Sequence, residues 1–363
     1  MTSDQDSTIR KRDAERRLEL GMTYAEQECW DEAIRECQAA LKIYPSLLEA
    51  HLQLGVAYTG KGRIDEAIRT LQTALKIDPN SPEAHYGLGV AYTMQGRLDK
   101  AIREQQAILH INPHDAEAHY GLGAVYGARE QWDDAIREYE AALSINPYFA
   151  EAHSNLGVAY GKKGLWDEAT REYQAALRID PSLIAPHVGL GFAYHMRGCP
   201  DDAIRVSKAA LCINPNCGEA HNNLGLAYAD KGRWEDAIRA YQTALSIDPN
   251  AAPVHCNLAE AYQMLSRSDE AIRELQAALR IDSNFGEAHY GLGVIYGMQG
   301  CFDEAILEFQ AALRANPESS DTHLQLGMAY SGLRRFEDAA RELRIAEQLG
   351  SSHAAEILTR MGL

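Results

Sequence analysis

The sequence lacks any long apolar run of the kind that crosses a membrane. No stretch of about 18 consecutive apolar residues occurs along the 363 residues. The first residues, MTSDQDSTIRKRD, are polar and contain no apolar core of a signal peptide. We therefore expect a cytoplasmic protein without a membrane partner.

Cysteine is scarce and follows no framework. The seven cysteines are an odd number, are scattered, and include no Cys-x-x-Cys pair. A disulfide-stapled scaffold needs paired cysteines at regular spacings, so the pattern indicates a reduced compartment. We interpret the cysteines as small buried side chains of a core.

The sequence contains fewer basic than acidic residues. Lysine and arginine number 35 against 52 acidic residues, which gives a formal net charge of −17. Such a surface repels phosphate backbones, so we predict no nucleic-acid partner and a partner that is neutral to basic. The basic stretch Arg10-Lys11-Arg12 is followed by acidic Glu15 and Glu19, a mixture typical of a solvated helix turn.

Histidine, by contrast, recurs at a strict period of 34 residues without insertion or deletion. These column histidines are His51, His85, His119, His153, His187, His221, His255, His289 and His323. An even period of this length indicates one structural unit copied along a line.

The neighbours of the histidines define the unit. A leucine-glycine pair, a tyrosine, two alanines and a proline follow each histidine with few exceptions. In one unit these are His51, Leu54, Gly55, Tyr58, Ala67, Ala74 and Pro79. The pattern extends back to Leu20-Gly21 and Tyr24, which makes ten units: 14-47, 48-81, 82-115, 116-149, 150-183, 184-217, 218-251, 252-285, 286-319 and 320-353.

The spacing within one unit predicts a helical hairpin. Histidine, leucine and tyrosine at intervals of three and four form one stripe of a first helix of roughly 13 residues. An acidic pair suits the start of the second helix, and we expect surface pairs four residues apart. These pairs are Asp65 with Arg69, Asp133 with Arg137, and Asp167 with Arg171. Glycine and alanine remove bulk where the helices cross, and stacked hairpins share one core.

The motif Leu-Gly-x-x-Tyr, followed by Ala, Ala and Pro, resembles the tetratricopeptide repeat. The resemblance implies an all-α fold, a right-handed superhelical solenoid of antiparallel helix pairs whose first helices line a concave groove. Within that family the groove holds a peptide, an extended tail or a partner helix.

The family often has tryptophan at the position of the column histidine. The lysine and asparagine clamp of chaperone-binding relatives is absent here, so we do not predict binding to a chaperone tail.

The resemblance also predicts the domain organisation. We expect a polar segment at 1-13, one continuous array at 14-353 and a capping helix at 354-363. In the last segment Ala354, Ile357, Leu358 and Met361 share one face. A self-association surface at the ends of the solenoid is a further hypothesis.

The column histidines do not predict a metal site. Donor atoms lie about 2 Å from a metal ion, whereas packed helices lie about 8–10 Å apart. Cys217 and His221, four residues apart, are a better candidate pair, but other repeats lack such a cysteine. We predict no metal, and rings packed between helices with their nitrogens hydrogen-bonded. Any histidine buried in the neutral form is expected to resist protonation, which would lower stability in acid.

Catalytic motifs are also lacking. Gly291, Gly293 and Gly297 resemble a dinucleotide-binding loop, but the same glycines recur within predicted helices of other repeats. We predict neither enzyme activity nor a cofactor.

Residues that vary beside the column histidine are the candidates for partner binding. By resemblance they face the groove, where tyrosine hydroxyls and amides bind a peptide over an apolar floor. The candidates are Tyr86, Tyr120, Asn155, Phe192, His195, Asn222, Asn223, Asn257, Glu260 and Tyr290. Only Asn155, Asn223 and Asn257 match the asparagine ladder of similar superhelices, which indicates a local amide cluster. Glycine occupies that position in most other repeats.

The eighth repeat is the least regular, with Ala259 for glycine, Ser266 at the turn and Ser283 for proline. It is either a drifted repeat or a bend near Glu260.

Two functions remain open. One is a non-catalytic scaffold or adaptor that binds a peptide or helix of a partner protein in its groove. The other is a structural or regulatory array that self-associates or forms an arm of a larger enzyme complex.

Overall fold

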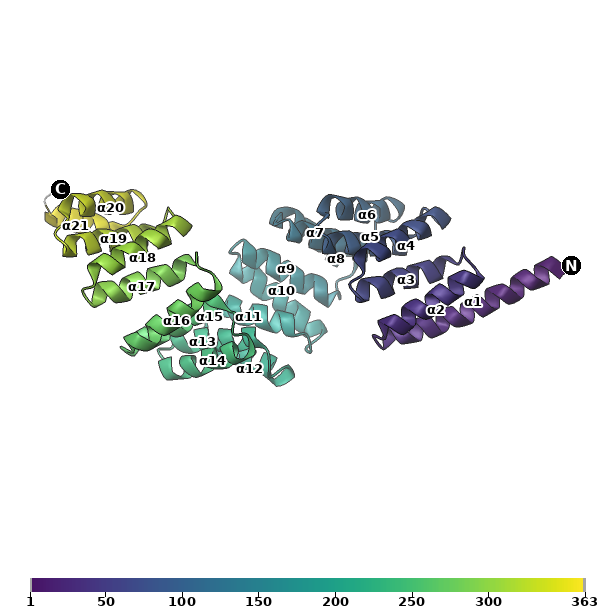
Figure 1. Cartoon of the computed structure of the whole chain (residues 1–363), viewed down its shortest axis with the longest axis horizontal. Coiled ribbons are helices and arrows are strands. Elements are labelled where there is room, and N and C mark those ends of the chain that lie inside the picture. The colour runs from purple at the N-terminus through teal and green to yellow at the C-terminus, as the bar shows by residue number, and fades with distance from the viewer. Residues whose placement is uncertain (1, 362–363) are drawn as a thin grey trace. The chain divides into compact units, whose positions relative to one another are not determined.

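The computed structural model describes residues 2–361, and the side chains of residues 8–360. These residues form helices and turns, and no strand occurs among them. The helices are α1 (Thr2–Glu26), α2 (Trp30–Ile43), α3 (Leu48–Gly60), α4 (Ile64–Ile77), α5 (Pro82–Met94), α6 (Leu98–Ile111), α7 (Ala116–Ala128), α8 (Trp132–Ile145), α9 (Ala150–Lys162), α10 (Trp166–Ile179), α11 (Ile184–Met196), α12 (Pro200–Ile213), α13 (Gly218–Asp230), α14 (Trp234–Ile247), α15 (Ala252–Met264), α16 (Ser268–Ile281), α17 (Gly286–Met298), α18 (Phe302–Ala315), α19 (Ser320–Gly332), α20 (Phe336–Gln348) and α21 (Ser352–Met361) (Figure 1). The predicted all-α fold is confirmed.

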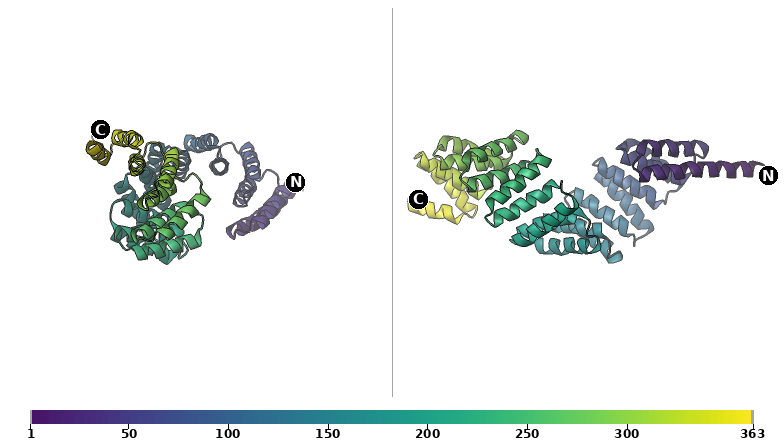
Figure 2. Two further views of the ribbon diagram at one scale, coloured as in Figure 1. Left: turned by 60° about the vertical axis from the view of Figure 1, so that its left-hand side comes forward. Right: turned by 90° about the horizontal axis from the view of Figure 1, so that it is seen from below.

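The chain divides into two compact units, Met1–Leu183 and Ile184–Leu363. In each unit every odd-numbered first helix up to α19 packs on the even-numbered helix that follows it, and neighbouring first helices also touch. Successive hairpins lie side by side in chain order within each unit (Figure 2). The division falls on a predicted repeat boundary, and the single continuous array stays a prediction.

Except in the eighth repeat, which has Ala259 instead, each hairpin pairs a glycine on the first helix with a core side chain on the second. A Cβ atom on Gly157 would lie 2.7 Å from Cε1 of Tyr173, so only glycine lets the helices approach this closely. The same relation holds for Gly293 and Phe309. The expected removal of bulk at helix crossings is confirmed. This core column is Cys37, Leu71, Gln105, Tyr139, Tyr173, Ser207, Tyr241, Leu275, Phe309 and Leu343.

Gln105 is a polar exception in the core column. Its side chain is buried between Gly89 and Gly121, and its Oε1 has no hydrogen-bond partner. Because an unsatisfied buried carbonyl costs about 1–3 kcal/mol, Gln105→Leu is expected to stabilise the protein by about 1–2 kcal/mol in urea unfolding. Leucine occupies this column at Leu71 and Leu275, so its volume fits.

The control for this change is Gln72→Leu on α4. The Gln72 amide donates a hydrogen bond of 3.1 Å to the Tyr92 hydroxyl, so leucine there removes an existing bond and brings no gain. Equal stabilisation by both changes would show that leucine stabilises these helices through propensity alone.

The turn within each hairpin requires a left-handed residue. Gly164 has φ 74°, whereas Ser266 takes the same conformation with φ 59° in the irregular eighth repeat. That repeat otherwise keeps the hairpin geometry, because α15 and α16 pack as the other pairs do. The Ser283 carbonyl also takes the place of a proline carbonyl beside His289, at 3.1 Å. The alternatives of a drifted repeat and a bend near Glu260 stay predictions.

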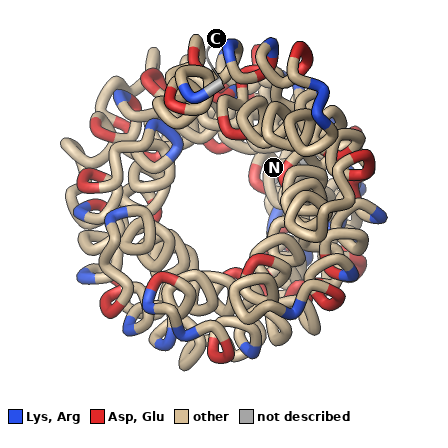
Figure 3. Tube along the Cα trace, turned by 90° about the vertical axis from the view of Figure 1, so that its left-hand side faces the viewer, with Lys and Arg blue, Asp and Glu red and all other residues tan. Residues whose placement is uncertain are grey.

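The predicted surface pair of Asp133 with Arg137 is wrong. Arg137 pairs with Asp134 and Arg171 pairs with Glu168, each three residues earlier. Asp133 instead pairs with Lys163 of the next hairpin. Asp133 is the second residue of α8, where its carboxylate lies beside the turn of the following hairpin and pairs with the lysine of that turn. Figure 3 shows acidic and basic residues interspersed along the Cα trace.

The two ends of the chain are helical. Helix α1 begins at Thr2, so the predicted polar segment 1-13 is largely part of this helix, and Ala14 and Leu18 are buried in the core it shares with α2 and α3. At the other end α21 packs on α20, with Ala354 and Leu358 buried. The Met361 side chain lies outside the described residues. None of the helices within residues 2–361 is long and apolar enough to cross a membrane.

Candidate partner-binding surface

The column histidines connect the two helices of a hairpin to the preceding turn. In six repeats Nδ1 faces a glutamate Oε2 on the second helix at 2.6–2.7 Å, and Nε2 faces a backbone carbonyl at 3.0–3.3 Å. The pairs are His85–Glu104, His119–Glu138, His153–Glu172, His255–Glu274, His289–Glu308 and His323–Glu342. The predicted packing with hydrogen-bonded nitrogens is confirmed for these rings.

Both nitrogens of these rings lie at acceptor oxygens, one of a carboxylate and one of a backbone carbonyl. The first repeat has a cation at the equivalent position, because Arg17 takes the column position and pairs with Glu36 at 2.8 Å. The hydrogen bond of His153 Nδ1 to Glu172 raises the pKa of His153, and burial opposes it only in part. In the hairpin of His187 the position of the glutamate is occupied by Val206, and burial lowers the pKa of His187.

No group of three or more potential metal ligands occurs among the described residues. Burial raises the pKa of the Cys256 thiol to about 12, with a smaller contribution from Glu287. This thiol stays protonated and packs as part of the core at neutral pH.

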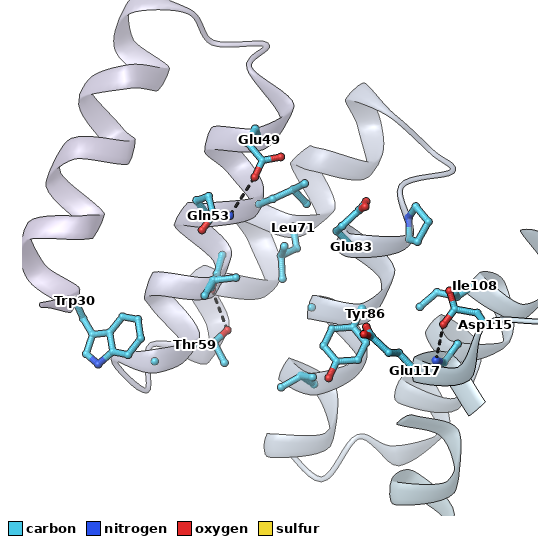
Figure 4. Close-up of a pocket in the computed structure, with 18 residues that line it drawn as sticks. Trp30, Glu49, Gln53, Thr59, Leu71, Glu83, Tyr86, Ile108, Asp115 and Glu117 are labelled. Atoms are coloured by element: carbon cyan, nitrogen blue, oxygen red, sulfur yellow. Dashed lines mark hydrogen bonds between the residues drawn. The ribbon is translucent and has the colours of Figure 1, made fainter. Parts of the chain in front are cut away.

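A pocket of about 660 Å³ opens on the first-helix surface of the first unit, the surface formed by α3, α5, α7 and α9. Its floor is apolar, with Val56, Leu71 and Val90 among the lining residues. Figure 4 shows Glu49, Gln53 and Thr59 of α3, Glu83 and Tyr86 of α5, and Glu117 of α7 around this pocket.

The pocket rim is acidic. Glu49, Glu83 and Glu117 occupy the first turns of α3, α5 and α7, and all three are exposed. Their hydrogen bonds come from neutral groups: Gln53 donates to Glu49, and the Ser81 hydroxyl donates to Glu83. No ion pair to these three carboxylates occurs within residues 8–360.

Of the predicted tyrosines, Tyr86 lines this pocket and Tyr120 lies on the next first helix, α7. The Tyr86 side chain is 40% exposed, and burial, then the nearby Glu117 charge, raises the pKa of its hydroxyl. Tyr120 is half-buried, with its ring centroid 4.8 Å from that of Phe149. Its hydroxyl accepts a hydrogen bond of 3.0 Å from Asn155. Tyr86 therefore offers the more open ring.

The predicted asparagines bond within the protein. Asn155, Asn223 and Asn257 donate to the preceding first helix: Asn155 to the Tyr120 hydroxyl, Asn223 to the Val188 carbonyl at 2.9 Å and Asn257 to Asn222 Oδ1 at 3.0 Å. The Asn223 side chain is buried, so a partner could reach its amide only by breaking this bond. These amides position adjacent first helices, a role that spacing alone does not distinguish from partner contact.

The other predicted residues lie on the second unit. A pocket of about 380 Å³ includes Phe192 and Asn222, and His195 Nδ1 faces Asp230 Oδ2 at 2.6 Å. Glu260 is exposed on α15. Tyr290 lines a separate pocket of about 390 Å³. The candidates therefore belong to several local surfaces.

Comparisons with known proteins identify the family. A model described as TPR repeat matches residues 57–96, 126–164, 162–198 and 225–266, and models described as tetratricopeptide repeat match residues 82–115 and 256–320. Together these segments cover more than half of the chain. The chain belongs to the tetratricopeptide repeat family. No curated protein sequence matches it significantly.

A solved structure of Pseudomonas aeruginosa pilF is similar to this tetratricopeptide repeat protein. The likeness has a TM-score of 0.51 at 19% identity, and it covers 58% of this chain and 97% of the pilF chain. At that identity it supports the fold alone. Tetratricopeptide repeats and this fold support a general role as a protein-interaction scaffold.

Proposed function

We propose that the protein is a non-catalytic scaffold that binds a peptide or helix of a partner protein on the first-helix surface. The observation that carries this proposal is the pocket of about 660 Å³ across three successive first helices. Concave pockets with apolar floors and few polar groups are the usual ligand sites of proteins.

Exposed apolar side chains at equivalent positions support this role. Val56 is 49% exposed and Val158 is 40% exposed, five residues after their column histidines. Phe192 takes the same position on α11 and is 39% exposed. Such side chains remain in contact with water in the free protein, and a partner that covers them gains hydrophobic free energy.

The test compares one charged substitution on the first-helix surface with one elsewhere. We expect Val56→Glu to abolish capture of partners from the native cell, because it places a charge on the apolar floor. Ile145→Glu changes an equally apolar, 36% exposed residue that does not line the pocket, and it should leave capture unchanged. Partners identified by mass spectrometry are then purified and titrated against both variants.

The competing function makes a different prediction. An array that self-associates would show a molecular mass that rises with concentration in light scattering of the purified protein. Equal binding by Val56→Glu and wild type, together with that rise, would replace the proposed function by self-assembly.

A further inference from the structure

We propose that the pocket on α3, α5 and α7 binds a basic peptide segment, in which arginine or lysine recurs at regular intervals between apolar side chains. This inference rests on the proposed function and names the chemistry of the partner. The apolar floor selects the apolar side chains, and the charge of the rim selects the basic ones.

The rim charge continues along both units. First helices carry an exposed acidic residue two positions before the column histidine, and we call these residues the acidic row. The acidic row is Glu49, Glu83, Glu117, Glu151, Glu219, Glu287 and Asp321. Helices α11 and α15 lack it, with Ala185 and Pro253 at that position. Members of the row line all three described pockets.

The acidic row differs from the acidic residues at the hairpin turns. Asp31, Asp99 and Asp133 pair with a basic residue of the next hairpin, whereas no member of the row pairs with lysine or arginine within residues 8–360. The row therefore places uncompensated negative charge on the first helices, which also expose apolar side chains. A cationic partner with apolar side chains would neutralise this negative charge and would also cover the exposed apolar side chains.

Tyrosines stand beside members of the row. The Glu117 charge acts on Tyr86, the Glu151 charge on Tyr120 and the Asp321 charge on Tyr290. A guanidinium or ammonium group placed here contacts a carboxylate and the face of an aromatic ring together. Cation–π contacts contribute about 0.5–2 kcal/mol, and charge-assisted hydrogen bonds add to them. Tyr86 and Glu117 form the most open of these sites (Figure 4).

The repeat spacing predicts the spacing of the basic residues. Neighbouring first helices are in contact, and packed helices lie about 8–10 Å apart. A peptide in the extended polyproline II conformation advances about 3.1 Å per residue and has three residues per turn, so every third side chain points the same way. One basic residue at every third position of such a peptide therefore matches one acidic residue per repeat, with apolar residues between them for Val56 and Val90.

The experiment measures binding of labelled synthetic peptides to the full chain by fluorescence anisotropy. The probe carries arginine at every third position with leucine and alanine between, and its matched control carries glutamine in place of arginine. We expect the arginine probe to bind at least about tenfold more tightly, and its affinity to fall between about 50 and 300 mM salt.

Protein variants locate the site. Glu83→Gln with Glu117→Gln keeps the shape of the rim and removes two charges, and it should weaken the arginine probe about tenfold. Asp65→Asn with Asp99→Asn removes two charges outside the pocket and should change affinity less than about twofold, as surface charges contribute little to a remote site.

The outcomes separate this inference from the proposed function. Equal affinity for the arginine and glutamine probes, or an equal loss with the two double variants, overturns the basic-peptide inference. If a purified natural partner still binds and Val56→Glu abolishes that binding, the scaffold function stands without it. If Val56→Glu leaves partner binding intact while Glu83→Gln with Glu117→Gln weakens the arginine probe, the basic site stands and the proposed mode of partner binding fails.

Discussion

Replacing Glu172 with glutamine is expected to cost about 1.5–3 kcal/mol of folding free energy near pH 6, and clearly less near pH 8. The loss near pH 6 is that of a charge-assisted hydrogen bond. His153 Nδ1 lies 2.6 Å from Glu172 Oε2, and Nε2 lies 3.2 Å from the Pro147 carbonyl. With glutamine at 172, the imidazolium keeps only the carbonyl and a neutral amide.

The sign of the pH dependence follows from the raised pKa of His153. The Glu172 hydrogen bond is the largest cause of the rise, the Pro147 carbonyl adds to it, and burial and the Arg178 charge oppose it. A histidine whose pKa is higher in the folded than in the unfolded protein stabilises the folded state. This stabilisation is fully present at pH values below the unfolded pKa of about 6.5. That contribution is lost as pH rises through the folded pKa. The expectation that acid lowers stability concerned histidines buried in the neutral form, and the raised pKa of His153 gives the opposite sign at this repeat.

His187 supplies the opposite control. Burial lowers its pKa, so its contribution is present above the unfolded value and is lost as pH falls through the folded value. We expect His187→Gln to raise stability near pH 5.5 relative to pH 8, whereas Glu172→Gln does the reverse. Thermal unfolding of both variants at the two pH values measures this. Parallel shifts in both variants would show that neither histidine is linked to folding.

Phe309→Ala is expected to destabilise the second unit by about 3–5 kcal/mol. The ring is 1% exposed, lies opposite Gly293, and belongs to a core cluster that includes Ile306, Leu326 and Tyr330. Glycine has no side chain to fill the space, so truncation leaves a cavity between α17 and α18. Because contacts in a stack are between neighbours, the loss should be largest in these hairpins.

The matched control is Leu307→Ala on the same helix. Its side chain is 66% exposed, so the change should stay within about 0.5 kcal/mol. Urea unfolding measures both variants, and hydrogen exchange locates the change, with lost protection expected in α17 to α19 for Phe309→Ala only. Similar losses for both variants would show that helix propensity, and not core packing, determines stability here.

The strict period made the hairpins predictable from local chemistry. Leu48–Gly60 has the predicted length of the first helix, and Ile64–Ile77 ends before Pro79, because helix periodicity, turn glycine and proline act within one unit. The side-chain partners were less predictable. Asp133 pairs across a turn with Lys163, 30 residues away, and local spacing does not identify a partner that stacking brings close.

The candidate site shows the same division. Tyr86 was identified as a variable residue next to the column, and it lies at the largest described pocket. Asn223 was identified by the same rule, yet its amide is buried and donates to Val188. The acidic residue of the row recurs as regularly as the histidine, at Glu49, Glu83 and Glu117 among others. In the sequence such residues cannot be distinguished from acidic residues that only stabilise the first turn of a helix. Their missing cationic partners became apparent only when the surrounding helices were in place.

The sequence by itself determined the repeat, its hairpin and the family, because these depend on the order and spacing of residues along one chain. Only the tertiary structure decided what each recurring residue faces. The column histidines face glutamates 19 residues later in six repeats, which makes them connectors between the two helices of a hairpin. Members of the acidic row line the described pockets instead. Charge and hydrogen bonding act through space, so the same residue type stabilises the stack in one place and remains available to a partner in another.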